Sequence, residues 1–174
     1  VSQGKIYNMQ SDKIIDTIKL DNELNSKEIK IVGLYDPEDY GLSIDMWSNT
    51  DGLKLKNLFE SIGKYSLSND ASDIMNISLL TNAYYPNQNI TKQEFSKYKS
   101  DWLIKDSNLE IIDEYLVKNQ IINLHPELTK YLVDIYLSKS NLKKSCEFFS
   151  KITIPIYDDY LSKFNLYCLI NYGK

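Results

Sequence analysis

The segments DWLIKDSNL (residues 101–109) and DIYLSKSNL (residues 134–142) are two versions of one pattern, 33 positions apart in the chain. The same offset places Glu114-Tyr115-Leu116 on Glu147-Phe148-Phe149. A third copy begins one offset later, and its apolar columns are Phe95/Leu128/Leu161, Tyr98/Tyr131/Phe164 and Trp102/Ile135/Cys168. A fixed period of this length is typical of stacked helix hairpins, in which each unit buries its apolar face against its neighbours.

This period predicts an all-α protein, built as a right-handed stack of antiparallel helix hairpins with an extended N-terminal arm. We expect a tetratricopeptide-like α-solenoid, because ankyrin's Thr-Pro-Leu-His signature is absent and two helices joined by a short turn fill each unit. The arm covers residues 1–49, and an irregular first hairpin covers residues 50–90. The repeats cover residues 91–174, as units 91–123, 124–156 and an incomplete 157–174.

Helix ends are predicted from capping residues and apolar spacing. Thr91 with Glu94, and Ser107 with Glu110, each have the S/T-x-x-E form of a capping box, while Thr50 is expected to cap the first helix. The predicted helices are 51–62, 70–84, 92–105, 108–118 and 126–137, followed by one that Ser140 or Asn141 caps and that runs to about Lys151, with one more starting at Asp158-Asp159.

Composition excludes some classes of partner. The formal charge is −4, from 20 basic and 24 acidic residues spread along the chain, without the basic stripe that a phosphate backbone requires. We therefore expect no nucleic-acid partner. No apolar run approaches the roughly 20 residues of a membrane-spanning helix, so membrane insertion is not expected either. Residues 1–15 do not have the pattern of a signal peptide.

No catalytic, cofactor or metal site can be built from the sequence. The sole histidine, His125, precedes Pro126 at a helix start, where we expect a capping or surface residue. Asn49 to Gly52 resembles part of a calcium loop, but the first and last ligand positions would be Trp47 and Leu58, which have no oxygen ligands. The acidic turn around Asp36 is interpreted as solvated.

A resemblance to a known family rests on several short elements taken together, which are Tyr35-Asp36-Pro37, Gly41-Leu42, Asp45-Met46-Trp47-Ser48-Asn49-Thr50, Leu58, Leu79-Leu80, Asn108-Leu109, Cys146, Cys168 and Tyr172-Gly173-Lys174. From about Tyr35 onward the chain resembles an uncharacterised family of alphaproteobacterial exported helical-repeat proteins. The resemblance implies a signal peptide removed before Val1 and a continuation past Lys174, but no activity. The chain departs from the family at the hairpin turns, where Asn and Lys replace Gly, Asp or Glu.

The two cysteines lie on helices that we expect to be antiparallel neighbours. If the connection turns near Pro155, Cys146 and Cys168 differ in height by roughly 6 Å, which a loop can absorb. An export signal would favour a disulfide, whereas a reducing cytosol would leave two buried thiols in the core. The sequence leaves both alternatives open.

The leading hypothesis is a non-catalytic helical-repeat scaffold or protein-interaction module of the bacterial cell envelope, located in the periplasm or exported. Tyr84, Tyr85 and Tyr157 lie off the core columns and are the expected contact residues for a protein partner. One alternative is the scaffold region of a larger envelope enzyme whose catalytic part lies beyond Lys174. Another is a cytosolic adaptor. The third unit lacks its second helix, so we expect further repeats or a partner to cover its apolar face of Leu161, Phe164 and Cys168.

Overall fold

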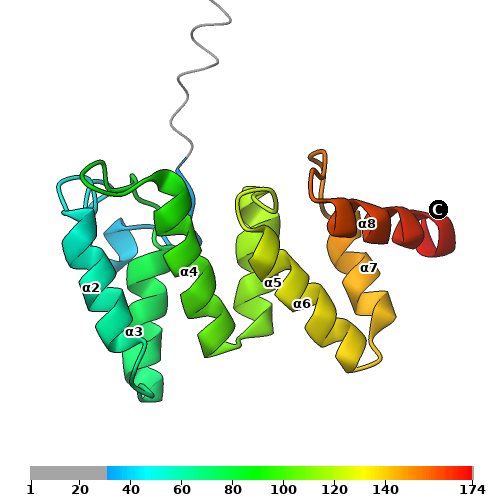
Figure 1. Cartoon of the computed structure of the whole chain (residues 1–174), viewed down its shortest axis with the longest axis horizontal. Coiled ribbons are helices and arrows are strands. Elements are labelled where there is room, and N and C mark those ends of the chain that lie inside the picture. Colours follow the sequence, from blue (N-terminus) through cyan, green and yellow to red (C-terminus); the bar gives the residue numbers. More distant parts are fainter. Residues whose placement is uncertain (1–30, 174) are drawn as a thin grey trace, which may run out of the picture. The chain divides into compact units, whose positions relative to one another are not determined.

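A computed structural model describes residues 31–173 of the chain, and these residues are helical (Figure 1). The elements in chain order are a short 3-10 helix η1 (Glu38–Tyr40) and the α-helices α2 (Gly52–Ile62), α3 (Asn69–Leu80), α4 (Lys92–Asp106), α5 (Leu109–Asn119), α6 (Pro126–Ser138), α7 (Leu142–Ser150) and α8 (Asp159–Tyr172). No β-strand occurs in this range, so the predicted all-α class is confirmed. The part of the predicted arm in residues 1–30 lies outside the described residues.

One helix is shorter than predicted. The second helix was expected to reach residue 84, but α3 ends at Leu80 because Thr81 leaves the helix in an extended conformation. Its neighbour Asn82 then donates its backbone N–H to the carbonyl oxygen of Tyr35, at 2.9 Å. Residues 81–83 therefore pair with the segment before η1 instead of continuing the helix.

The capping prediction is right for α4 and for α7, which Asn141 caps by accepting the Lys144 backbone N–H at 3.1 Å, and wrong for α2 and α5. Thr91 and Glu94 form the expected box, with the Thr91 backbone N–H donating to the Glu94 carboxylate at 2.8 Å. Ser107 instead ends α4 in a left-handed conformation, and Asn108 caps α5. Likewise Asp51, not Thr50, accepts the first amides of α2. Asn and Asp reach these amides with one short side chain, so the adjacent hydroxyl residue is not used.

The helices pack between units as well as within them. Helix α6 contacts α4, α5, α7 and α8, and α7 also contacts α8. Phe95, Leu128 and Leu161, which the sequence pattern places in one column, are almost completely buried in the three helices α4, α6 and α8. Burying each of these side chains contributes about 1.5–3 kcal/mol, so apolar packing outweighs the exposed ion pairs in stabilising the fold.

The loops that join the units are linked by side-chain to backbone hydrogen bonds. The Gln120 side chain accepts from the Thr153 backbone N–H at 2.7 Å, and Asn123 accepts from the Tyr157 N–H at 3.0 Å. Asn119 binds both backbone groups of Gly33 in the same way. Gly33 itself passes so close to residues 80–82 that a Cβ would lie 2.5 Å from the Asn82 nitrogen. These polar links hold each connecting segment against the next.

Candidate functional site

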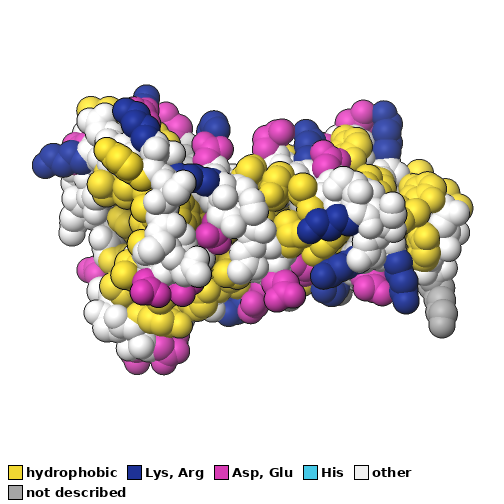
Figure 2. Space-filling model, turned by 90° about the horizontal axis from the view of Figure 1, so that it is seen from below, with side chains coloured by type: hydrophobic (Ala, Val, Ile, Leu, Met, Phe, Trp, Pro, Cys, Tyr) yellow, Lys and Arg dark blue, Asp and Glu magenta, His cyan; other side chains and the backbone are white. Residues whose placement is uncertain are grey.

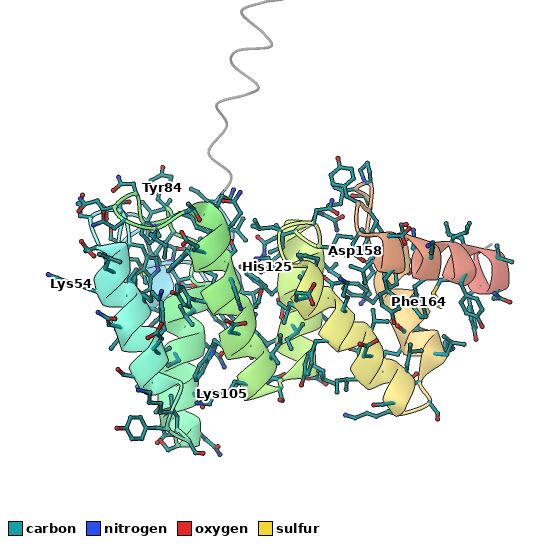
Figure 3. All side chains as sticks on the ribbon, in the orientation of Figure 1. Lys54, Tyr84, Lys105, His125, Asp158 and Phe164 are labelled. Atoms are coloured by element: carbon teal, nitrogen blue, oxygen red, sulfur yellow. A yellow bond between two sulfur atoms is a disulfide. The ribbon has the colours of Figure 1, made fainter. Side chains whose placement is uncertain are left out.

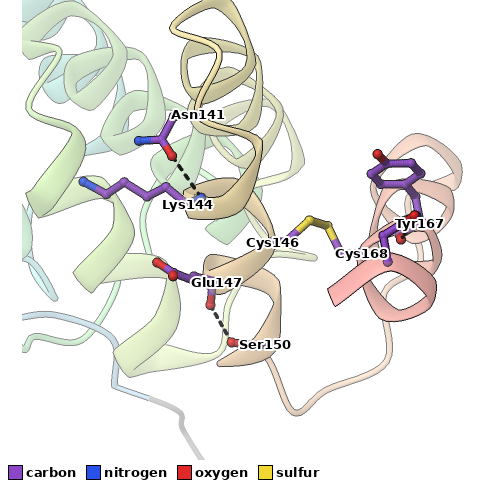
Figure 4. The surroundings of a disulfide bond; sticks show 8 residues. Asn141, Lys144, Cys146, Glu147, Ser150, Tyr167 and Cys168 are labelled. Carbon is purple, nitrogen blue, oxygen red and sulfur yellow. Dashed lines mark hydrogen bonds between the residues drawn. A yellow bond between two sulfur atoms is a disulfide. The ribbon is translucent and has the colours of Figure 1, made fainter. Parts of the chain in front are cut away.

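The two cysteines form a disulfide between α7 and α8. Their Cα atoms are 5.2 Å apart, and both side chains are buried (Figure 4). The alternative of two free buried thiols is therefore not what the structure contains. The bridge joins the second helix of one unit to the first helix of the next, so it fixes α8 to the helices before it.

Removing this bridge is expected to destabilise the fold. The cysteines are 22 residues apart in sequence, and a loop of that length predicts a loss of about 3 kcal/mol on the chain-entropy estimate. We expect the Cys146→Ala/Cys168→Ala variant to unfold at a correspondingly lower urea concentration than the oxidised protein. An unchanged midpoint would contradict this, and adding reductant to the variant, which has no thiol, controls for non-specific effects.

Helix α8 exposes an apolar surface that carries no charge. Leu166, Leu169 and Ile170 are each more than half exposed, and residues 166–172 contain no charged side chain. Figure 2 shows apolar side chains gathered at the end of the molecule where α8 lies. At the 33-residue offset, Leu166 and Leu169 correspond to Val133 and Tyr136 of α6, which are buried. The exposed positions of α8 are thus positions that helices cover one unit earlier.

A shallow hollow of about 360 Å³ continues this surface toward α7, lined by Leu142, Tyr160, Lys163, Phe164 and Tyr167. The Phe164 ring packs against Phe149, with ring centroids 5.6 Å apart, and points between α7 and α8 (Figure 3). Asp158 caps α8 and forms an ion pair with Lys130 at 2.9 Å, which lowers the pKa of its carboxyl. The uncharged stretch of α8, residues 166–172, together with this hollow, is hereafter the α8 face.

The structure does not bring Tyr84, Tyr85 and Tyr157 together. Tyr157 is 80% exposed in the loop before α8. Tyr84 and Tyr85 are partly buried, and the Tyr85 ring packs edge-on against Phe95, with ring centroids 5.7 Å apart. The expected exposure of Tyr85 is wrong because the loop after α3 folds over the core column that begins with Phe95. Burial consequently raises the pKa of the Tyr85 hydroxyl.

His125 is buried, so its prediction as a capping or surface residue is wrong. It occupies the position before α6 but makes no side-chain cap. Its Nδ1 lies 2.7 Å from the Ser100 hydroxyl and its Nε2 lies 3.3 Å from the Tyr115 hydroxyl. Ser100 donates its own hydrogen to the Ser96 carbonyl oxygen, so the network fits a neutral ring with the proton on Nδ1. Burial, together with the Lys99 charge, lowers the pKa of His125 to about 3.

Lys99 precedes Ser100 on α4 and is only 2% exposed. Its ammonium lies 5.4 Å from the Phe95 ring centroid and 5.5 Å from that of Tyr85. No hydrogen-bond acceptor or carboxylate partner for it occurs within residues 31–173, and burial lowers its pKa to about 7. The aromatic faces compensate for part of the lost hydration. These buried groups lie inside the core, and none of them lines a groove described here.

Within the described part of the chain, no three His, Cys, Asp or Glu side chains are grouped to bind a metal ion. None of the helices between residues 31 and 173 has the length and hydropathy needed to cross a membrane. Comparison of the chain with protein-family models, curated proteins and solved structures finds no match.

Proposed function

We propose that the chain is a non-catalytic helical-repeat scaffold that binds a partner protein through the α8 face. The hairpins α4/α5 and α6/α7, followed by α8, are the units of the proposed tetratricopeptide-like right-handed solenoid. The observation that carries the proposal is the uncharged, exposed row Leu166, Leu169 and Ile170. A contiguous exposed apolar surface of this kind is typical of protein–protein contacts.

The occupant that fits this surface is an α-helix with an apolar, uncharged face. One unit earlier, the equivalent residues Val133 and Tyr136 are covered by helices, because α6 packs against α5, α7 and α8. A partner helix would lay its side chains between those of α8, with aromatic contacts from Phe164 and Tyr167 at the hollow. Residues 166–172 carry no charge, and the one charged residue that lines the hollow, Lys163, is 73% exposed and paired with Asp159, so its ammonium can stay in solvent.

We propose that the protein works outside the cytoplasm, in the bacterial envelope. The Cys146–Cys168 bridge supports this location, because disulfides persist in the periplasm and outside the cell and are rare in a reducing cytosol. The charge of −4 without a basic stripe is also consistent with a protein partner and not with a nucleic acid.

The test compares two surface variants of the same protein. Leu166→Asp/Ile170→Asp introduces two charges on the α8 face, and Leu53→Asp/Ile74→Asp makes the same change at equally exposed positions of α2 and α3. We expect a partner recovered from envelope extract by the wild type and by the control, and at least tenfold weaker binding by the α8 variant, because each lost apolar contact is worth about 1.5 kcal/mol or more.

The captured protein is then purified and its Kd is measured against all three proteins, each checked for an unchanged circular dichroism spectrum. Equal binding by the α8 variant and the wild type would refute the proposal. Loss of binding in both variants would do the same, because it would show a general effect of added negative charge.

A further inference from the structure

A small cavity, separate from the α8 face, lies where α2, α3 and α4 meet (Figure 1). Its volume is about 170 Å³. Five apolar or aromatic side chains form its wall, which are Phe59, Ile62, Met75, Tyr98 and Trp102. Trp102 is buried, but the other four are only partly buried. The packing of the three helices therefore leaves apolar surface between them that a ligand can cover.

The polar atoms of these wall residues do not need a ligand. The Trp102 indole N–H donates to the Asn76 side-chain oxygen at 2.8 Å, and the Asn76 amide in turn donates to Asp106 at 3.2 Å. Tyr98 is partly exposed, so water can bind its hydroxyl. The wall consequently favours an apolar occupant, which gains from leaving water without having to satisfy buried donors or acceptors.

The charged residues that line the cavity are already paired or lie in solvent. Asp101 forms an ion pair with Lys97 at 2.8 Å, and Glu60 is exposed. The Lys105 ammonium donates to carbonyl oxygens at the end of α2, which are those of Ile62, Gly63 and Tyr65. The bond to Gly63 is 2.9 Å long. Since carboxylates and ammonium groups both surround the opening, neither sign of charge is favoured, and we expect the occupant to be uncharged.

We propose that this cavity binds a small, uncharged molecule with a single aromatic ring. An apolar cavity of about 150 Å³ accepts benzene, whereas sites for drug-sized ligands have about 300–1,000 Å³, so the volume selects one ring. The rings of Phe59 and Tyr98 already pack with centroids 5.3 Å apart, and a ligand ring can extend this contact towards Trp102. Met75 is a flexible side chain that can adjust to the shape of the ligand.

The test titrates three probes of similar size into the isotope-labelled protein and follows them by NMR. Toluene is neutral, benzoate is an anion and benzylammonium is a cation, so the series separates ring binding from charge recognition. Met75→Trp fills the cavity from α3, whereas Met75→Leu nearly conserves its volume. Leu142→Trp is the matched control, because it adds the same bulk at the hollow of the α8 face. A circular dichroism spectrum checks the fold of each variant.

We expect the wild type to bind toluene with a Kd on the order of 0.1–1 mM, with shifts centred on the wall residues. Both charged probes should bind at least tenfold more weakly, because the cavity offers their charge no partner. Met75→Trp should also lose at least tenfold, while Met75→Leu and Leu142→Trp stay within threefold.

The comparison of the three probes uses the wild type, so it tests the proposal even if Met75→Trp does not fold. Shifts centred on α8 would overturn the proposal, as would either charged probe binding as tightly as toluene. Undiminished toluene binding by a folded Met75→Trp variant would overturn it too.

Discussion

Replacing Lys99 by methionine is expected to stabilise the protein at neutral pH by about 2–4 kcal/mol. The ammonium is buried between the rings of Phe95 and Tyr85, and its pKa falls to about 7. The unfolded chain holds this proton up to about pH 10.5, so folding at pH 7 carries the cost of burying the charge or releasing it. Methionine has a similar length, no charge and favourable contacts with aromatic rings.

The pH dependence of the stability gain shows whether it comes from removing the buried charge of Lys99 or from better packing of methionine. Between about pH 7 and 10.5 the unfolded state binds more protons at this position, so wild-type stability rises with pH and the advantage of Lys99→Met shrinks. Urea unfolding of both proteins at pH 7 and pH 9 measures the difference. Lys97→Met, at an exposed position of the same helix, is the control and should change stability by less than about 0.5 kcal/mol. A stability gain independent of pH would contradict the explanation.

Acidification is expected to unfold the protein through His125. Its pKa in the fold is about 3, well below the ordinary 6.5, so the folded state holds the ring neutral. The lowered pKa of His125 makes its full contribution to stability above about pH 6.5, and this contribution is lost as the pH falls from there towards 3. At about 1.36 kcal/mol per unit, the loss is about 2 kcal/mol by pH 5 and on the order of 4 kcal/mol at pH 3.

The physical reason is the hydrogen-bond network around the ring. A proton on Nε2 would face the Tyr115 hydroxyl hydrogen, and the new charge would lie near Lys99. His125→Gln keeps two polar ends but cannot be protonated, so it should lose less stability than the wild type between pH 6.5 and 5. Parallel pH dependences for the two proteins would contradict this assignment. The carboxylates titrate in both proteins, so their contribution to the pH dependence of stability cancels in the comparison.

Most of the helices and their core columns could be predicted from the sequence, because apolar spacing and period are local signals. Phe95, Leu128 and Leu161 were placed in one column and are all buried. The Lys99 site had a signal that was missed. Lys99 lies four residues after Phe95 and three before Trp102, which places it on the buried side of α4. The spacing of Lys99 predicts a buried side chain, whereas the residue type alone predicts an exposed one.

Other features could not be predicted because they depend on how distant segments pack. The shared face of Glu110, Asp113 and Glu114 follows from their spacing on α5, but the burial of Tyr136 follows from how α6 packs against its neighbours. His125 was interpreted from its position before Pro126, a local context that says nothing of Ser100 or Tyr115. The exposed row of α8 was not predicted either: counting along the repeat placed the uncovered face at Leu161, Phe164 and Cys168, but Leu161 and Cys168 are buried against the preceding helices, and the exposed residues lie on the opposite side of α8.

The hydrogen bonds between connecting loops bear on how the protein opens. The side chains of Gln120 and Asn123 accept the amides of Thr153 and Tyr157, so a loop that opens gives up these links to its neighbour. Because the groups are exposed, water replaces the lost hydrogen bonds and the free-energy cost of opening is small. We therefore expect the connecting loops to open locally at lower free energy than the buried packing between the hairpins.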